Sequence, residues 1–216
     1  MTQRAYSPKD IARIRIKELP LEGKWQESFG LPSRYDTWFI SGQSASGKSA
    51  FSMQLSKELC RYGYVLYISL EEGVGKTFKD RMARERMDEV QGRFRVITDS
   101  DIDALKARLK KPRSGNFIIV DSIQYSEWLY PQIKDLVDSF PRRCFIFISQ
   151  EYRGKPMGKG AERVRYMAGV KVRTIGFKAF CQGRSIGSAA APYTIWEEGV
   201  IATSNNKATT SNNKEE

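Results

Sequence analysis

Residues 42–49 read Gly42-Gln43-Ser44-Ala45-Ser46-Gly47-Lys48-Ser49 and match the pattern G-x-x-x-x-G-K-[ST]. The apolar run Trp38-Phe39-Ile40 precedes them, and a helical pattern over Lys48–Tyr62 follows. A glycine-rich turn between a strand and a helix N-terminus presents backbone N–H groups and the positive end of the helix dipole to phosphate. We therefore predict that residues 42–49, together with Ala50, bind nucleotide phosphates. Lys48 would contact the β and γ oxygens, and Ser49 would ligate Mg²⁺.

Strand-like and helical patterns alternate along the chain on both sides of this loop, which predicts an α/β domain with a mainly parallel sheet. The predicted strands are Thr37–Ser41, Tyr64–Leu70, Phe94–Thr98, Asn116–Asp121 and Cys144–Ser149. The predicted helices after Lys48–Tyr62 are Lys76–Met87, Ile102–Lys110 and Pro131–Phe140. Beyond Gly169, an antiparallel C-terminal extension of the sheet is predicted from Val170–Ile175, Phe177–Gln182 and Pro192–Trp196.

The 216 residues are enough for one domain with additional ends. Residues 1–35 combine a short helix, predicted over Asp10–Lys17, with proline and glycine, so we expect an N-terminal arm or lead-in. Residues 36–202 would form the core. Residues 203–216 are rich in Asn, Ser, Thr and charge, and they carry too little apolar area to pack, so a disordered tail is expected.

Composition excludes several classes of protein. The chain has no histidine, which excludes Ser-His-Asp and Cys-His catalysis and histidine-ligated metals. Its three cysteines are isolated and odd in number, so neither a disulfide framework nor a zinc site is expected. With no apolar run near the length of a membrane helix and no secretory signal, the sequence predicts a cytoplasmic protein without a membrane partner.

Carboxylates follow two of the predicted strands. Glu71 and Glu72 come after the second strand, and Asp121 ends the apolar run Phe117–Val120. Because ligands bind at the carboxyl ends of parallel strands, we predict that Glu71 polarises a water molecule for attack on the γ-phosphate. Asp121 would hold the Mg²⁺ shell opposite Ser49. The alternatives are a solvated glutamate pair near a helix N-terminus and an aspartate that only ends a strand.

Gln150 ends the fifth predicted strand, Cys144–Ser149, at the same sheet edge. Its amide could sense the γ-phosphate through a hydrogen bond. The simpler alternative is a plain strand end.

The net charge of +11 favours a polyanionic partner, and most of the excess lies in one segment. Residues 151–185 hold nine basic and two acidic residues, a net charge of +7. Glycines and Tyr152 are interleaved with the cations, as expected of a mobile loop that contacts single-stranded nucleic acid. The predicted contacts are Tyr152, Arg153, Lys155, Lys159 and Arg163. The alternative is a solvated basic face that supports solubility or subunit contacts.

The ordered motifs GQSASGKS, YISLEEG, IIVDS and FISQ together resemble the RecA-type ATPase core, which includes recombinases, RadA-like and KaiC-like proteins and DnaB-like helicases. The resemblance covers roughly residues 36–198. It implies a RecA-like P-loop NTPase fold that uses ATP and Mg²⁺, with Glu71 as the water-activating residue and Glu72 as second choice. Gln150 would couple the γ-phosphate to residues 151–160, which occupy the place of a DNA-binding loop.

The same resemblance extends to Gln182-Gly183-Arg184, which is similar to the K-x-R finger that completes a neighbouring subunit's site. Arg184 would be the finger, although Gln182 stands where lysine is usual. The chain as a whole is similar to small RecA-type recombination ATPases of phages and mobile elements.

These features predict an ATPase that works between subunits of a ring or filament and couples hydrolysis to single-stranded DNA binding in recombination or replication. Three alternatives stay open. They are a KaiC-like or RadA-like regulatory or assembly ATPase with a protein partner, a P-loop kinase of a small molecule, and a filament or scaffold protein in which nucleotide only sets assembly.

Overall fold

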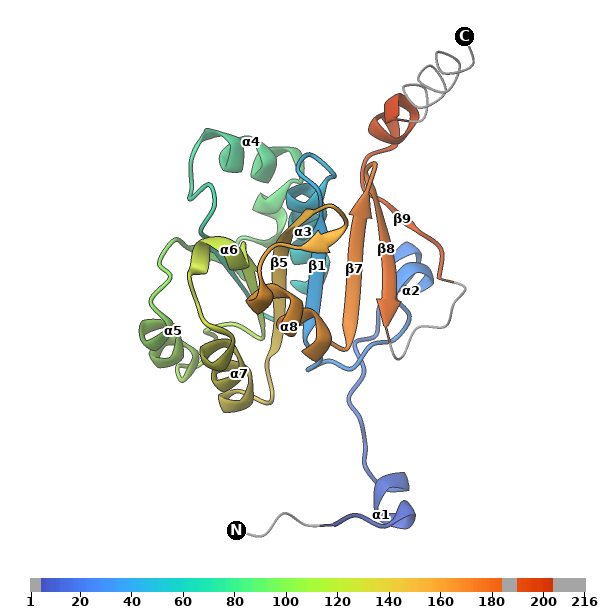
Figure 1. Cartoon of the computed structure of the whole chain (residues 1–216), viewed down its shortest axis with the longest axis vertical. Helices are drawn as coiled ribbons and strands as arrows, with labels where there is room; N and C mark the ends of the chain where they lie inside the picture. Colours follow the sequence, from blue (N-terminus) through green and yellow to red (C-terminus); the bar gives the residue numbers. More distant parts are fainter. Residues whose placement is uncertain (1–4, 184–189, 204–216) are drawn as a thin grey trace.

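The computed structural model describes residues 5–183 and 190–203. Its centre is one sheet with the strand order β3-β2-β4-β5-β1-β7-β8-β9, and β6 pairs with β5 (Figure 1). The six strands from β3 to β7 in this order are parallel, and β6, β8 and β9 pair antiparallel. The predicted α/β class, with a mainly parallel sheet and an antiparallel C-terminal extension, is confirmed.

The strand bounds lie close to the predicted ones. They are β1 Trp38–Gly42, β2 Val65–Ser69, β3 Phe94–Ile97, β4 Phe117–Asp121, β5 Cys144–Tyr152, β6 Lys155–Pro156, β7 Val170–Ile175, β8 Lys178–Gly183 and β9 Tyr193–Thr194. The labelled helices are α1 Pro8–Ala12, α2 Lys24–Phe29, α3 Lys48–Leu59, α4 Lys76–Arg84, α5 Ile102–Leu109, α6 Ile123–Ser126, α7 Tyr130–Ser139 and α8 Lys159–Met167, with a 3₁₀ turn at Met87–Val90. Residues 197–203 are also helical.

Helices cover both faces of the sheet, so its central strands are buried on both sides. Successive strand residues alternate between the faces, as the pleat requires. Ile146 and Ile148 pack with α2, α3 and α4, whereas Phe147 packs with α5, α7 and α8. This packing explains why the predicted strands read as nearly continuous apolar runs.

The segment predicted as a mobile basic loop is instead a hairpin followed by a helix. Glu151 pairs with Pro156 and Tyr152 with Lys155. The two turn residues, Arg153 and Gly154, have φ values of 49° and 77°, the left-handed backbone that a tight two-residue hairpin needs. Three small or apolar residues of the next segment, Ala161, Val164 and Ala168, are buried against the sheet, which accounts for helix α8.

The N-terminal helix is shorter and begins earlier than the predicted Asp10–Lys17. Ser7 caps it by accepting a hydrogen bond from the Asp10 backbone N–H, and the Asp10 carboxylate accepts one from the Ser7 backbone N–H. This reciprocal capping box, with Pro8 in the first turn, fixes the start of α1. Helix α1 ends at Ala12 and buries none of its residues.

The rest of the N-terminal segment packs on the sheet. Leu19, Leu21 and Phe29 are at most 2% exposed and belong to the core that contains Trp38. The Trp25 ring in α2 stacks on Tyr193, with ring centroids 4.3 Å apart. In this way α2 covers the edge of the sheet formed by β8 and β9, while α1 projects away from the sheet (Figure 1).

Two further predictions concern the C-terminal tail and membrane helices. The tail predicted for residues 203–216 lies outside them, except for Thr203. Over the residues that the structure describes, no helix combines the length and apolar character needed to cross a membrane.

The packing of Phe29 predicts that part of the N-terminal segment is needed for stability. Phe29→Ala should lower the free energy of unfolding by about 3–5 kcal/mol, since it removes a fully buried aromatic side chain. Ile14→Ala, at a side chain 53% exposed, should change it by less than about 0.5 kcal/mol. Urea unfolding followed by circular dichroism measures both, and equal effects would contradict this division of the segment.

Candidate nucleotide-binding site

The loop at residues 42–49 passes from β1 to α3 at the carboxyl edge of the sheet. Gly42 packs so closely on β7 that a Cβ atom there would lie 2.2 Å from Thr174 Oγ1 and 2.7 Å from the Thr174 carbonyl oxygen. Gly47 has a φ of 97° and immediately precedes α3. Ser46 Oγ and Thr174 Oγ1 form a hydrogen bond of 2.7 Å. Both glycines of the motif are therefore required by the backbone.

Lys48 is the first residue of α3, and its side chain returns to this loop. Its ammonium donates to the carbonyl oxygens of Gly42 at 2.9 Å and Gln43 at 2.7 Å. Burial lowers the pKa of Lys48, and the negative charges of Glu71, Asp121 and Glu151 oppose that shift. The ammonium is thus held at the loop by carbonyls and feels the charges of three carboxylates.

Asp121 ends β4 and is only 4% exposed. The Tyr67 hydroxyl donates to its Oδ2 at 2.5 Å and forms a second hydrogen bond, of 2.9 Å, with Ser52 Oγ. Burial raises the pKa of Asp121 to about 6, although the hydrogen bond from Tyr67 acts in the opposite direction. Ser52 Oγ also lies 3.0 Å from the Ser49 carbonyl oxygen, so these contacts link Asp121 to the backbone of Ser49, the other predicted Mg²⁺ ligand.

These groups fit Mg²⁺ by their chemistry, because a hydroxyl and a carboxylate are the hard oxygen ligands it takes beside phosphate and water. Asp121 carries a buried negative charge that a cation would offset. Among the described residues there is no group of three or more Asp, Glu, Cys or His side chains that could hold a metal by themselves. The site therefore fits a metal brought in with a phosphate ligand.

The two adjacent glutamates have different partners. Glu71 is exposed and accepts a hydrogen bond from Gln150 Nε2 at 3.1 Å. Glu72 is paired with Arg81 through both of its carboxylate oxygens and accepts from Thr77 Oγ1 at 2.7 Å. Burial raises the pKa of Glu72, but the hydrogen bonds from Arg81 and Thr77 outweigh it and the net shift is downward. Glu72 therefore fixes α4, whereas Glu71 faces the strand end that carries Gln150.

No protein-family model matches the chain. It is 29% identical over 85 residues to the DNA repair protein RadA of Streptococcus pneumoniae, a match that covers 39% of this chain and 19% of that protein. RadA of Streptococcus pyogenes serotype M6 matches with the same identity over 18% of its length. The chain thus spans about a fifth of the length of these curated relatives.

The solved structures include a much fuller match. The KaiC-like protein PH0186 of Pyrococcus horikoshii OT3 superimposes with a TM-score of 0.58 at 16% sequence identity, over 82% of this chain and 94% of that one. The chain has the fold of the RecA-type P-loop ATPases. The sequence resemblance to this group is thereby confirmed at the level of the fold.

The RecA-type sheet brings most of the predicted site residues together. Gly42 is the register partner of Gln150, and Ser69, which precedes Glu71 by two residues, is the partner of Asp121. The backbone N–H groups of Leu70 and Glu71 both donate to the Asp121 carbonyl oxygen, at 2.7 and 3.2 Å. Arg184, the predicted finger, lies outside the described residues.

Sequence reasoning missed a buried carboxylate of this candidate site. Glu151 follows Gln150 in β5, and its side chain is 3% exposed. It accepts from Ser41 Oγ at 2.8 Å and from Arg173 Nε at 3.0 Å, so it joins β5 to β1 and β7 beneath the loop. The available signal was a charged residue that continues an apolar strand.

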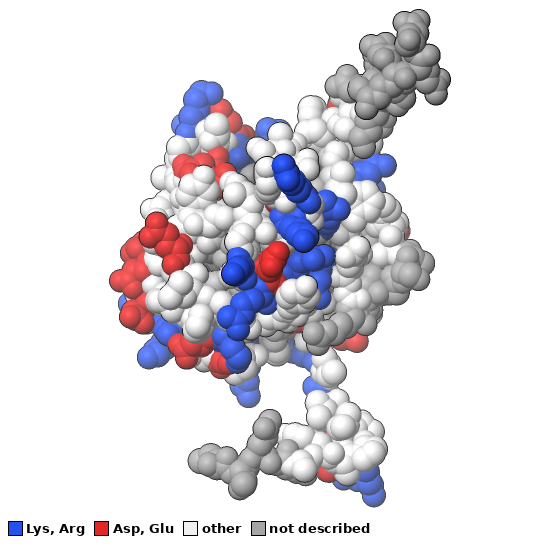
Figure 2. Space-filling view, viewed as in Figure 1, with Lys and Arg blue, Asp and Glu red and all other residues white. Residues whose placement is uncertain are grey.

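The predicted nucleic-acid contacts divide into two groups. Tyr152, Arg153 and Lys155 are exposed on the hairpin, where the Arg153 guanidinium lies 5.2 Å from the centre of the Tyr152 ring. Lys159 begins α8, but Arg163 stacks on the Tyr130 ring at 4.3 Å and so is directed towards α7. Figure 2 shows basic side chains gathered over the face that carries β6 and α8.

The different partners of Glu71 and Glu72 predict different losses on substitution. Glu71→Gln should leave stability within about 0.5 kcal/mol, because the side chain is exposed, but should abolish ATP turnover. Glu72→Gln weakens a largely buried ion pair and should lower the free energy of unfolding by about 1–3 kcal/mol while turnover continues in the folded fraction. Phosphate release and denaturant unfolding distinguish the two variants. Full turnover in Glu71→Gln would contradict the assignment.

Proposed function

We propose that the chain is an ATPase that binds ATP with Mg²⁺ on residues 42–50 and couples its hydrolysis to binding of single-stranded DNA. The observation that carries the proposal is the hydrogen bond between Glu71 and Gln150. It joins an exposed carboxylate to a strand end that continues directly into the basic hairpin. Lys48 and Asp121 occupy the same sheet edge, and the RadA and KaiC-like relatives support an ATPase at the level of the superfamily.

In the proposed reaction Lys48 exchanges its two loop carbonyls for β- and γ-phosphate oxygens. The exposed Glu71 carboxylate orients a water molecule and accepts its proton. Mg²⁺, held by Ser49 and backed by Asp121, would offset phosphate charge when bound. The Gln150 amide, released from Glu71, can donate to the γ-phosphate. Arg184 of a neighbouring copy would supply a further cation.

The hairpin supports the choice of single-stranded DNA. Tyr152 is 64% exposed and offers a ring on which a base can stack. Arg153 and Lys155 are exposed beside it and can contact phosphates, and Met157 adds an exposed apolar side chain. The name of the curated relatives, DNA repair protein RadA, is in keeping with a DNA partner in recombination or repair.

The proposal predicts salt-sensitive binding that depends on the hairpin. Arg153→Ala combined with Lys155→Ala should weaken binding of a fluorescent oligo(dT) and lower the slope of log affinity against log salt by about 1 to 2. A matched control is Lys110→Ala with Arg142→Ala, two exposed basic residues after α5 and before β5, at the edge of the sheet away from the hairpin. Fluorescence anisotropy at several salt concentrations gives both slopes.

Turnover in the same preparations separates the alternatives. DNA should stimulate phosphate release by the wild type but not by Lys48→Ala, which lacks the phosphate-binding ammonium. Turnover without any acceptor molecule excludes a small-molecule kinase. Wild-type turnover without DNA binding would favour a regulatory ATPase with a protein partner.

We further propose that the chain assembles head to tail through its N-terminal arm, defined as residues 5–18. Ile11, Ile14 and Ile16 in the arm are 57%, 53% and 70% exposed. The arm also carries four basic and two acidic residues. An exposed apolar and basic segment of this kind needs an apolar and acidic surface to bind.

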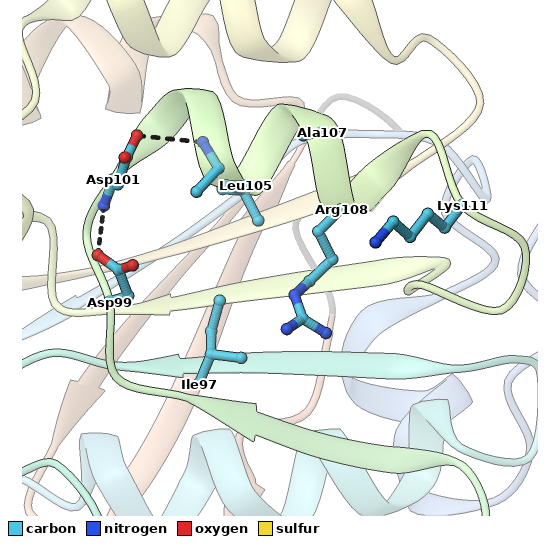
Figure 3. A pocket seen from close by; sticks show the side chains of 8 residues that line it. Ile97, Asp99, Asp101, Leu105, Ala107, Arg108 and Lys111 are labelled. Atoms are coloured by element: carbon cyan, nitrogen blue, oxygen red, sulfur yellow. Dashed lines mark hydrogen bonds between the residues drawn. The ribbon is translucent and has the colours of Figure 1, made fainter.

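A candidate surface lies at the β3 edge of the sheet, opposite the β8–β9 edge. A groove between the edge strand β3 and helix α5 is lined by Ile97 and Leu105, with Asp99 and Asp101 at one end and Arg108 and Lys111 at the other (Figure 3). The acidic end is the part that fits a basic segment. Figure 2 shows acidic side chains gathered on this side of the molecule. Because arm and groove are different surfaces of one chain, their pairing generates a ring or filament.

The arm contact predicts a loss of assembly on charge insertion. Ile11→Asp combined with Ile14→Asp should shift the protein towards monomer in light scattering, because carboxylates would face both the apolar lining of the groove and Asp99. Ile201→Asp, at an isoleucine 61% exposed in another part of the chain, is the matched control. Unchanged assembly in the double variant would exclude the arm as the contact.

A further inference from the structure

Gln124 is the second residue of α6, three residues after Asp121, and its side-chain amide bonds to two other segments of the chain. Its Oε1 accepts from the Gln150 backbone N–H at 3.2 Å. Its Nε2 donates to Ser149 Oγ at 2.9 Å and to the Met157 carbonyl oxygen at 3.0 Å. The one amide therefore connects the segment after β4, the C-terminal part of β5 and the residue that follows the return strand β6.

These bonds meet at Gln150. The Gln150 carbonyl oxygen accepts from the Met157 backbone N–H at 2.9 Å, and its side chain donates to Glu71. Its backbone N–H is held by Gln124. When the Gln150 side chain changes its conformation at the nucleotide site, the hydrogen bonds of the Gln150 backbone either resist the movement or pass it on to Met157.

The strand pairing within the hairpin is short. It is paired by only two residue pairs, Glu151 with Pro156 and Tyr152 with Lys155. A two-stranded hairpin of this size is marginal without support from other elements. Gln124 supplies support at its base, because both Nε2 hydrogens are used and one of them reaches Met157.

The residue type matters, because the position needs one acceptor and two donors on a single side chain. Glutamate keeps the acceptor and loses both donors, and methionine of similar length loses all three hydrogen bonds. A side chain that only filled space would tolerate methionine at this half-buried position.

We propose that Gln124 is a positioning residue that couples the nucleotide site to the basic hairpin, so that ATP and single-stranded DNA change each other's affinity through its amide. The inference rests on the proposed function for the identity of both ligands. Gln124 contacts neither ligand and acts through Gln150 and Met157. The coupling is reciprocal, as linkage between two binding sites requires.

The first test measures oligo(dT) affinity in the presence of ADP and of a non-hydrolysable ATP analogue. In the wild type the ratio of the two affinities should fall in the 5–150-fold range typical of coupled sites. Gln124→Met should bring the ratio close to 1 while ATP-analogue affinity without DNA changes by less than about threefold. Gln91→Met, at an exposed glutamine next to the 3₁₀ turn, is the control and should keep the wild-type ratio.

The second test does not use DNA. Trypsin can cut the chain after Arg153, at the exposed tip of the hairpin. In the wild type the ATP analogue should change the rate of this cut, whereas in Gln124→Met the rate should be higher and independent of nucleotide. Gln124→Glu, which keeps the acceptor for Gln150, should also cleave faster because Met157 loses its donor.

The outcomes separate the two proposals. Without DNA binding in the wild type the proposed function fails, but a nucleotide-dependent cut that Gln124→Met abolishes still supports the coupling. A wild-type affinity ratio retained in Gln124→Met overturns it. The coupling is also overturned if nucleotide does not change the rate of cleavage in the wild type. A loss of nucleotide affinity in Gln124→Met as large as the loss of coupling overturns it too, because that result would indicate a purely structural role.

Discussion

The register of the central parallel strands is the constraint on which the site depends. Gly42 lies beside Gln150 on one side and Thr174 on the other, and Ser69 lies beside Asp121. Both faces of these strands are buried, so a slip of one residue would turn an entire apolar set towards the wrong layer. The packing of the core therefore fixes which side chains meet at the carboxyl edge. The positions of the polar side chains at that edge therefore depend on the apolar alternation of strands such as β5. The phenylalanines and isoleucines of β5 face different helical layers.

Three carboxylates close to one ammonium would repel one another if they were held only by Lys48. Each instead has its own partner: Gln150 for Glu71, Tyr67 for Asp121, and Ser41 with Arg173 for Glu151. The partners differ in kind, and so do the consequences. Glu151 is paired with the Arg173 guanidinium and serves the scaffold, whereas burial raises the pKa of Asp121 to about 6 against the opposing hydrogen bond from Tyr67. An uncompensated buried carboxylate is the group that gains most from a nearby cation.

The parts of the molecule that follow from local pattern were predictable from the sequence. The phosphate-binding loop and the strands around it are set by spacing and apolar periodicity, and they lie within a few residues of their predicted bounds. The parts that were missed depend on contacts between distant residues. Ser41 and Glu151 are 110 positions apart, and Tyr67 and Asp121 are 54 apart, so no window of sequence contains either pair. The hairpin is predicted as a loop because its Arg153-Gly154 turn and dense charge are locally typical of one, and its two residue pairs are visible only in the fold.

The position of Glu151 also decides how the hairpin can move. Successive residues of β5 point to opposite faces, so Gln150 and Tyr152 share one face while Glu151 points to the other. Glu151 is the buried member of the three and is tied to β1 and β7 through Ser41 and Arg173. It is therefore a fixed point between the residue that meets the nucleotide and the residue that begins the hairpin. Motion of Gln150 cannot slide β5 along the sheet without breaking that ion pair, which would leave a charge buried and uncompensated. The motion that remains is a change in the direction of the hairpin, controlled from outside the sheet by the Gln124 amide.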